Sequence, residues 1–159
     1  MKRSMISALH LSAALVLGTA AVASASPCSN VGVAGEWGYT FTGTLILPTG
    51  TVPFAGVGRY TLDAAGNFSG TQTSSRGGLT SEDTINGTAT VNADCTGTFT
   101  VDIYDQSGTL LRSAVWAMVY VDKANEIRSI LTSLVLHPSG TVVPAVVTDT
   151  AKRLSAHPE

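Results

Sequence analysis

Apolar and polar residues alternate along most of this chain, and no segment of helical length shows the 3.6-residue apolar period of an amphipathic helix. From Trp37 to Leu45 the aromatic and apolar residues and one glycine hold the odd-numbered positions, with threonine at most positions between them. Phe99, Val101 and Ile103 repeat the pattern. A period of two is typical of strands with one buried face, so the sequence predicts an all-β protein.

Short turns interrupt the alternation at regular intervals. Segments such as 63–66 and 105–108 open with Asp and close with Gly, which suits a type I turn followed by a left-handed residue. A similar Pro- and Gly-containing turn occurs in LILPTGTVP (45–53) and LVLHPSGTVVP (134–144), which we interpret as one tight turn used twice, with duplication of a half-barrel as the alternative. The predicted strands span residues 36–47, 51–62, 67–75, 79–91, 96–104, 109–121, 126–136 and 141–150.

Strands joined by turns of hairpin length pair antiparallel with their neighbours. Closing such a sheet removes its unpaired edges, and an even number of strands lets the first pair antiparallel with the last. We therefore predict an eight-stranded antiparallel up-and-down β-barrel over residues 36–153, with a tail at 154–159. A β-sandwich is the alternative.

The first 25 residues are typical of a secretory signal peptide. Lys2 and Arg3 precede an apolar stretch that is too short for a membrane span, and Ala23-Ser24-Ala25 forms a cleavage site. We expect a secreted or periplasmic protein without a membrane span. The net charge of −2 and the lack of Lys/Arg clusters argue against nucleic acid, and the histidines lack the spacing of a metal site. No metal and no cofactor are expected.

The two cysteines, Cys28 and Cys95, are expected to form one disulfide in an exported chain, with two free thiols as the alternative. Alternate turns of a barrel lie at alternate ends, which places both cysteines at the end that holds the termini. A bond between them would hold residues 26–35 as a strap across that end.

Gly35-Glu36-Trp37 opens the first predicted strand, and Arg153 follows the last. This pair of motifs resembles the lipocalins and related calycin barrels, whose first strand begins with G-x-W. The resemblance implies that Trp37 plugs the barrel floor and that Arg153 stacks on it, closing one end. The chain departs from lipocalins in having no predicted helix after the eighth strand. It is similar, more loosely, to small secreted bacterial barrels akin to allene oxide cyclase, from which no catalytic residue is carried over.

If Trp37 points inward, the same face carries most of the aromatic residues. An eight-stranded interior either is filled by side chains or holds one small ligand. Glycines at 43, 56 and 58 favour a cavity by removing side-chain volume, with packing of neighbouring rings or easier strand curvature as the alternative. We therefore predict a small apolar ligand inside the barrel. The predicted ligand-lining residues are Tyr39, Phe41, Phe54, Tyr60, Leu62, Phe68, Phe99, Val101 and Ile103.

The sequence carries no recognised catalytic motif, so catalytic residues stay unassigned and the prediction leans away from an enzyme. The alternatives are a cofactor-free cyclase or isomerase in the same cavity, with the Tyr39 and Tyr60 hydroxyls, and a filled barrel acting as a structural or interaction module. Arg112 and Arg128 are expected on the surface, with contact to a carboxylate in the cavity or to Glu36 as the alternative. The adjacent Glu82 and Asp83 are expected on opposite faces.

The third and fourth predicted strands are polar on both faces and are expected to be solvated. Strands six to eight are apolar on both faces, and a large exposed apolar patch is unusual on a monomer. We therefore predict a homo-oligomer formed through strands six to eight, with cover by an N-terminal segment or tail as the alternative.

Overall fold

The computed structural model describes residues 27–156, so the predicted signal peptide lies outside the described residues. One short helix precedes a series of strands. The elements are α1 (Asn30–Val33), β1 (Gly35–Leu47), β2 (Gly50–Leu62), β3 (Asn67–Arg76), β4 (Leu79–Val91), β5 (Thr96–Tyr104), β6 (Leu110–Val121), β7 (Glu126–Leu136), β8 (Thr141–Val142) and β9 (Ala145–Ala156).

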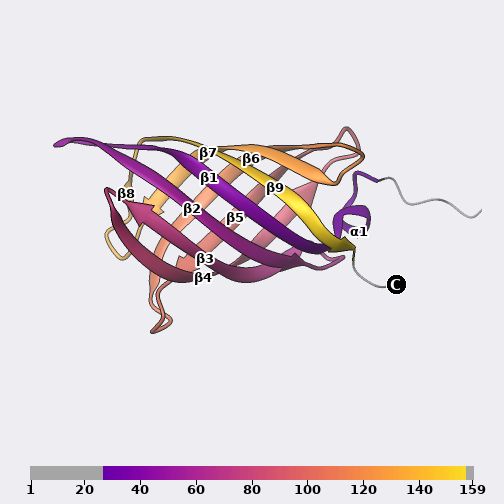
Figure 1. Cartoon of the computed structure of the whole chain (residues 1–159), viewed down its shortest axis with the longest axis horizontal. Helices are drawn as coiled ribbons and strands as arrows, with labels where there is room; N and C mark the ends of the chain where they lie inside the picture. Colours follow the sequence, from indigo (N-terminus) through magenta and orange to yellow (C-terminus); the bar gives the residue numbers. More distant parts are fainter. Residues whose placement is uncertain (1–26, 157–159) are drawn as a thin grey trace, which may run out of the picture.

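The strands form a closed antiparallel barrel (Figure 1). Strands β1 to β7 pair consecutively, and β9 pairs with both β7 and β1, which closes the sheet. Strand β8 adds two residues to the edge of β7 beyond the point where β9 leaves it. The prediction of an eight-stranded up-and-down barrel is confirmed.

The last strand differs from its prediction. It was expected over 141–150 and is instead broken at Val143 and Pro144, after which β9 continues to Ala156. Proline has no N–H to donate to a ladder, which accounts for the break. Arg153 therefore lies within β9, paired opposite Trp37, and the segment predicted as a tail begins as strand. The expectation that Arg153 follows the last strand is therefore wrong.

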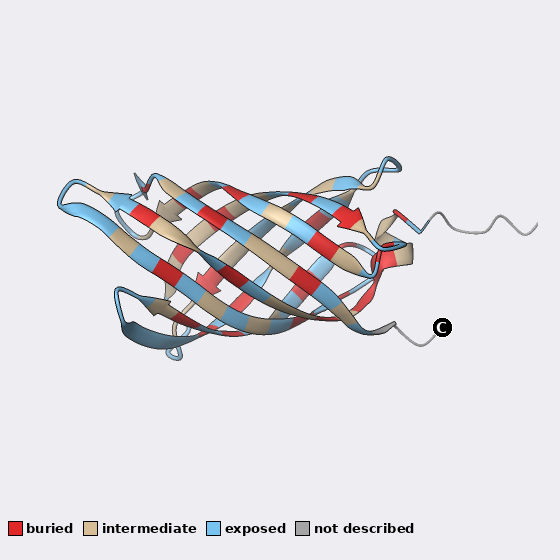
Figure 2. Ribbon diagram, turned by 45° about the horizontal axis from the view of Figure 1, so that its top comes forward, coloured by how far each residue is buried: buried red, intermediate tan, exposed pale blue. Residues whose placement is uncertain are grey.

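Buried and exposed residues alternate along each strand, as Figure 2 shows. The inward side chains of all the long strands form one core that includes the fully buried Trp37, Leu62, Ile127 and Val147. In the described part of the chain, no helix is long and apolar enough to cross a membrane.

The outer face of the later strands carries several exposed aliphatic side chains. Val119 on β6, Ile130 on β7 and Val146 on β9 are 39%, 48% and 61% exposed. Polar residues lie between them, since Ile130 pairs with Thr148 of β9 and Val119 pairs with Arg128 of β7. The expected self-association through this face stays a prediction.

Candidate ligand-binding site inside the barrel

One end of the barrel is closed by the segment that precedes β1. Cys28 and Cys95 form a disulfide with their Cα atoms 4.9 Å apart, which ties this segment to the β4–β5 turn. The segment crosses the end as the single helical turn α1, with the Ser29 side chain accepting a hydrogen bond from the Gly32 N–H. Val33 of α1 is fully buried against the barrel. The disulfide therefore holds a lid over the terminal end (Figure 1).

Trp37 and Arg153 lie directly beneath this lid. The Trp37 indole N–H donates to the Val33 carbonyl at 3.0 Å, and its side chain is fully buried. The Arg153 guanidinium lies 5.1 Å from the centre of the Trp37 ring, within the range of a cation–π contact. It also donates to the Gly32 carbonyl at 2.8 Å and the Ala124 carbonyl at 3.3 Å. Arg153 thus joins the floor, the lid and the β6–β7 turn.

Above the floor lies a cavity of about 80 Å³. Of the predicted ligand-lining residues, the structure places all but Leu62 on its wall, and Leu62 is fully buried outside it. Tyr60 packs against Phe68, Phe99 and Tyr39 with ring centres 5.4, 5.7 and 5.7 Å apart. The cavity is lined by Tyr39, Phe41, Phe54, Tyr60, Phe68, Gln72, Ile85, Phe99, Val101, Ile103, Arg112, Ala114, Trp116, Ser129, Leu131, Leu134 and Asp149.

The inward glycines do not create this cavity, which corrects the argument from the sequence. A Cβ on Gly56 would lie 2.4 Å from the Phe41 ring, and one on Gly58 would lie 2.6 Å from the Tyr39 ring and hydroxyl. The volume that these glycines leave is therefore taken by the rings of β1. Because Tyr39, Gly58 and Gln72 pair across β1, β2 and β3, Gly58 lets the Tyr39 hydroxyl pass over β2 and reach Gln72.

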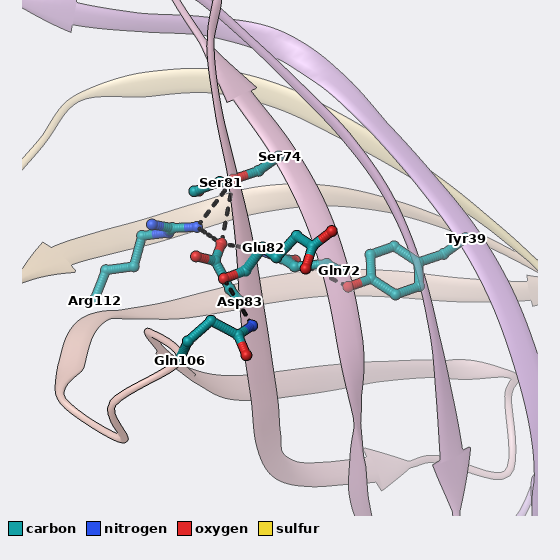
Figure 3. A network of polar contacts seen from close by, with 8 residues as sticks. All are labelled: Tyr39, Gln72, Ser74, Ser81, Glu82, Asp83, Gln106 and Arg112. Atoms are coloured by element: carbon teal, nitrogen blue, oxygen red, sulfur yellow. Dashed lines mark hydrogen bonds and ion pairs between the residues drawn. The ribbon is translucent and has the colours of Figure 1, made fainter.

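A polar network crosses the interior above the cavity (Figure 3). The Arg112 guanidinium of β6 donates to the Asp83 carboxylate of β4 at 2.6 Å. The same carboxylate oxygen accepts from the Gln72 amide at 3.0 Å and the Ser74 hydroxyl at 3.2 Å. The Tyr39 hydroxyl donates to Gln72 at 2.9 Å, which extends the network from β6 to β1.

This network overturns two expectations from the sequence. Arg112 is 9% exposed and faces inward, whereas Arg128 is exposed as expected. The inward faces of β3 and β4 are not solvated either, because Gln72, Ser74 and Asp83 bury their polar groups against one another. Burial acts to raise the pKa of Asp83, but the Gln72 hydrogen bond and the Arg112 charge outweigh it and hold the pKa below its ordinary value.

Asp149 of β9 is a second inward carboxyl among residues 27–156, and it was not among the predicted site residues. The Ser129 hydroxyl of β7 donates to its Oδ2 atom at 3.0 Å, and its side chain lines the cavity. Burial raises the pKa of Asp149 to about 7, although the Ser129 hydrogen bond acts in the opposite direction. The alternation of faces along the strand could have revealed its inward position, because Asp149 lies between Val147 and Ala151, which are both buried on the same face.

A second hollow of about 310 Å³ lies at the open end, and we call it the vestibule. Phe54, Arg112 and Leu134 line both the vestibule and the cavity, so the two adjoin at the polar network. Its other lining residues are Leu45, Leu47, Ser74, Arg76, Leu79, Thr80, Ser81, Leu136 and Val143.

Ser113, Asp102 and His137 form a polar cluster on the outside of the barrel. The Ser113 hydroxyl donates to the Asp102 carboxylate and lies 3.0 Å from the His137 Nε2 atom. In a catalytic triad the histidine lies between the serine and the carboxylate, whereas here Ser113 lies between Asp102 and His137. The cluster is therefore not arranged for nucleophilic catalysis. Within residues 27–156, no group of His, Cys, Asp and Glu could hold a metal ion.

These features define a closed antiparallel β-barrel with one sealed end and an aromatic cavity that adjoins an open vestibule. The chain matches no protein-family model and no curated protein. It is similar to the solved structure of EF1p2_mFAP2b bound to DFHBI, with a TM-score of 0.54 and 11% identity over 81% of this chain and 99% of that one.

A second solved structure, a redesigned β-barrel, mFAP1, bound to DFHBI, gives a TM-score of 0.51 and 16% identity over 79% of this chain and 99% of that one. At these identities the likeness shows the fold alone. The resemblance to lipocalins and calycins stays a prediction.

Proposed function

We propose that this protein binds a small apolar molecule inside its barrel. The observation that carries the proposal is a cavity walled by aromatic and aliphatic side chains that adjoins a wider vestibule at the one open end. Ligand pockets are typically concave and mostly apolar, with a few polar groups that fix orientation. Both structurally similar barrels are described as bound to DFHBI, which supports a binding role for the interior.

Titration calorimetry with 1-hexanol tests this proposal, using a matched pair of variants. Ala114 lines the cavity, whereas Ala117 on the same strand faces outward. Ala114→Leu fills the cavity and should abolish saturable binding, while Ala117→Leu should retain it. Saturable binding by the wild type should also show the negative heat-capacity change of apolar burial. If the wild type does not bind 1-hexanol, or if Ala114→Leu binds it as well as the wild type does, the proposal is wrong.

A second candidate function is proton transfer on a bound ligand, and Asp149 favours it. A general base works best when its pKa lies near the operating pH, and the pKa of Asp149 is about 7. Exchange of the α-protons of cyclohexanone for deuterium, followed by NMR, measures this activity. Exchange that is no faster with the wild type than with Asp149→Asn would exclude Asp149 as a base for this probe.

We also propose that the protein is exported and forms a homo-oligomer. Structural disulfides persist mainly in oxidising compartments, so the Cys28–Cys95 bond supports a secreted or periplasmic protein. N-terminal sequencing from the host should find Ser26 as the first residue. Native mass spectrometry of the oxidised protein tests the predicted homo-oligomer through β6, β7 and β9, and a monomer at micromolar concentration would contradict it.

A further inference from the structure

We infer that the ligand is a small organic cation, with an ammonium group bound in the cavity between the Asp149 carboxylate and the aromatic rings, and with an apolar body that extends toward the vestibule. This inference rests on the proposed function and names its ligand class. It is carried by the placement of Asp149, by the charges around the cavity and by the rings beside it.

The Asp149 carboxylate has one oxygen in use and one available. Ser129 donates to Oδ2, and among residues 27–156 no group donates a side-chain hydrogen bond to Oδ1. The Asp149 side chain is partly exposed and lines the cavity, so Oδ1 is placed to accept a hydrogen bond from a molecule bound there. A ligand that donates a hydrogen bond would complete the coordination of this carboxylate.

The charges around the cavity favour a cation. Arg112 and Asp149 are the charged side chains on its wall, and Arg112 is already paired with Asp83 behind it. When Asp149 ionises, the cavity wall therefore carries one negative charge that no cation on this wall is free to pair with. Burial opposes that charge, as the raised pKa of Asp149 reflects, and a bound ammonium group would neutralise it.

Aromatic rings surround the same position. Asp149 pairs directly with Phe41 across β1 and β9, and Tyr39 precedes Phe41 on the inward face. The ring centres of Tyr39 and Phe41 lie 6.5 Å apart, and Tyr60 lies 5.7 Å from Tyr39. Rings grouped around a carboxylate are suited to ammonium ligands, because the ring faces attract a cation that has left water.

The available volume limits the part of the ligand that enters the cavity. The cavity of about 80 Å³ is smaller than the roughly 300–1,000 Å³ of a typical ligand pocket, so it accommodates only part of a ligand. The vestibule of about 310 Å³, lined by Leu45, Leu79 and Leu136 among others, has room for an apolar body. An ammonium head with an aliphatic tail fits both hollows.

An anionic ligand fits the cavity less well. Arg112 is the cation that such a ligand would approach, and its Nη2 atom already donates to Asp83 at 2.6 Å and to Ser74 at 3.5 Å. A ligand carboxylate would compete with Asp83 for Arg112 and would add a second negative charge to a cavity that contains Asp149.

Three probes with the same tail separate the possibilities: hexylammonium, 1-hexanol and hexanoate. Calorimetry at pH 8, where Asp149 is ionised, should show hexylammonium binding at least about tenfold more tightly than 1-hexanol, as expected for about 1.4 kcal/mol of added interaction. Hexanoate should bind most weakly. Asp149→Asn should lose the preference for hexylammonium and retain 1-hexanol binding, while the outward-facing Asp102→Asn should behave like the wild type.

The pH dependence of wild-type binding gives an independent readout. Tyr39 and Tyr60 interact electrostatically with Asp149, and Arg112, which is paired with Asp83, lines the same cavity. Burial raises both tyrosine pKa values, and that of Asp83 is lowered. Asp149, with its pKa of about 7, changes its ionisation between pH 6 and 8. The affinity for hexylammonium should therefore rise across this range, while that for 1-hexanol should not rise.

The outcomes distinguish this inference from the proposed function. Equal affinities for hexylammonium and 1-hexanol, unaffected by Asp149→Asn, would overturn the inference and leave the binding function intact. Tightest binding of hexanoate would overturn it and point to Arg112 as the recognition group. If none of the three probes binds, the inference and the proposed function both fail.

Discussion

The two ends of this barrel are built in different ways. At the closed end, α1, the disulfide and the Trp37–Arg153 contact seal the floor with apolar packing and hydrogen bonds to backbone carbonyls. Toward the open end, the interior is crossed by the buried Arg112–Asp83 ion pair and opens into the vestibule. Apolar packing and a covalent bond thus predominate at one end, whereas a buried ion pair and a hollow lie toward the other.

Replacing Trp37 should cause the largest loss of stability at the closed end. Trp37→Ala should lower the free energy of unfolding by about 3–5 kcal/mol, the usual cost of deleting a buried tryptophan. Denaturant titration measures the loss. Trp116, which lines the cavity and is only partly buried, provides the matched control, and Trp116→Ala should cost clearly less. Equal costs would mean that the floor is no more important to stability than the wall.

Removing the disulfide tests whether the lid depends on it. Cys28 and Cys95 are 67 residues apart in sequence. Loop-closure entropy predicts a loss of about 4 kcal/mol when both are replaced by serine. Hydrogen exchange should quicken first in α1, while the amides of the β1–β2 hairpin at the other end keep their protection relative to global unfolding. Uniform loss of protection would show that the lid and the barrel unfold as one unit.

Removing charges from the polar network tests how much the Arg112–Asp83 ion pair contributes to stability. Arg112→Met leaves the Asp83 carboxylate buried without its cation and should cost about 3 kcal/mol of unfolding free energy. Arg112→Met combined with Asp83→Leu removes both charges and should recover most of that loss. Denaturation of both variants measures the difference. A double variant as unstable as the single one would mean that the ion pair itself stabilises the barrel.

Asp149 should make stability depend on pH. Its folded pKa is about 7 and its unfolded value is near 3.8, so the folded state holds the proton more tightly. The stability from this group is complete below the unfolded pKa and is lost as the pH rises through the folded one. Between pH 5 and pH 8 the wild type should lose about 2–3 kcal/mol relative to Asp149→Asn. Parallel stability curves for the two proteins would contradict the raised pKa.

The closed end and the cavity wall were largely accessible from the sequence. The alternation of polar and apolar residues predicted the strands. Counting every second residue from Trp37, and continuing across the tight hairpin, predicted that Tyr39, Phe41, Phe54 and Tyr60 face inward, and the structure has them there. Tight turns fix the register between neighbouring strands, so an assignment made on β1 carries to β2 and β3.

The polar part of the interior was not accessible in the same way. Strands β3 and β4 carry polar residues on both faces, so alternation of hydrophobicity cannot say which side of them is buried. Asp83 and Arg112 are far apart in the sequence, and each is tolerated inside only because the other is there. Their pairing depends on how the closed barrel brings β4 and β6 together, and the residue pattern within one strand carries no information about that arrangement.

The disulfide, α1 and the end of β9 all lie at the sealed end of the barrel (Figure 1). Anything attached after β9, such as a biotin tag for immobilisation on a sensor chip, would therefore sit opposite the opening. Molecules captured on a surface in this way would share one orientation and present the vestibule to the solution. The same geometry would place a fluorophore near the β1–β2 turn beside the vestibule and far from the anchoring point.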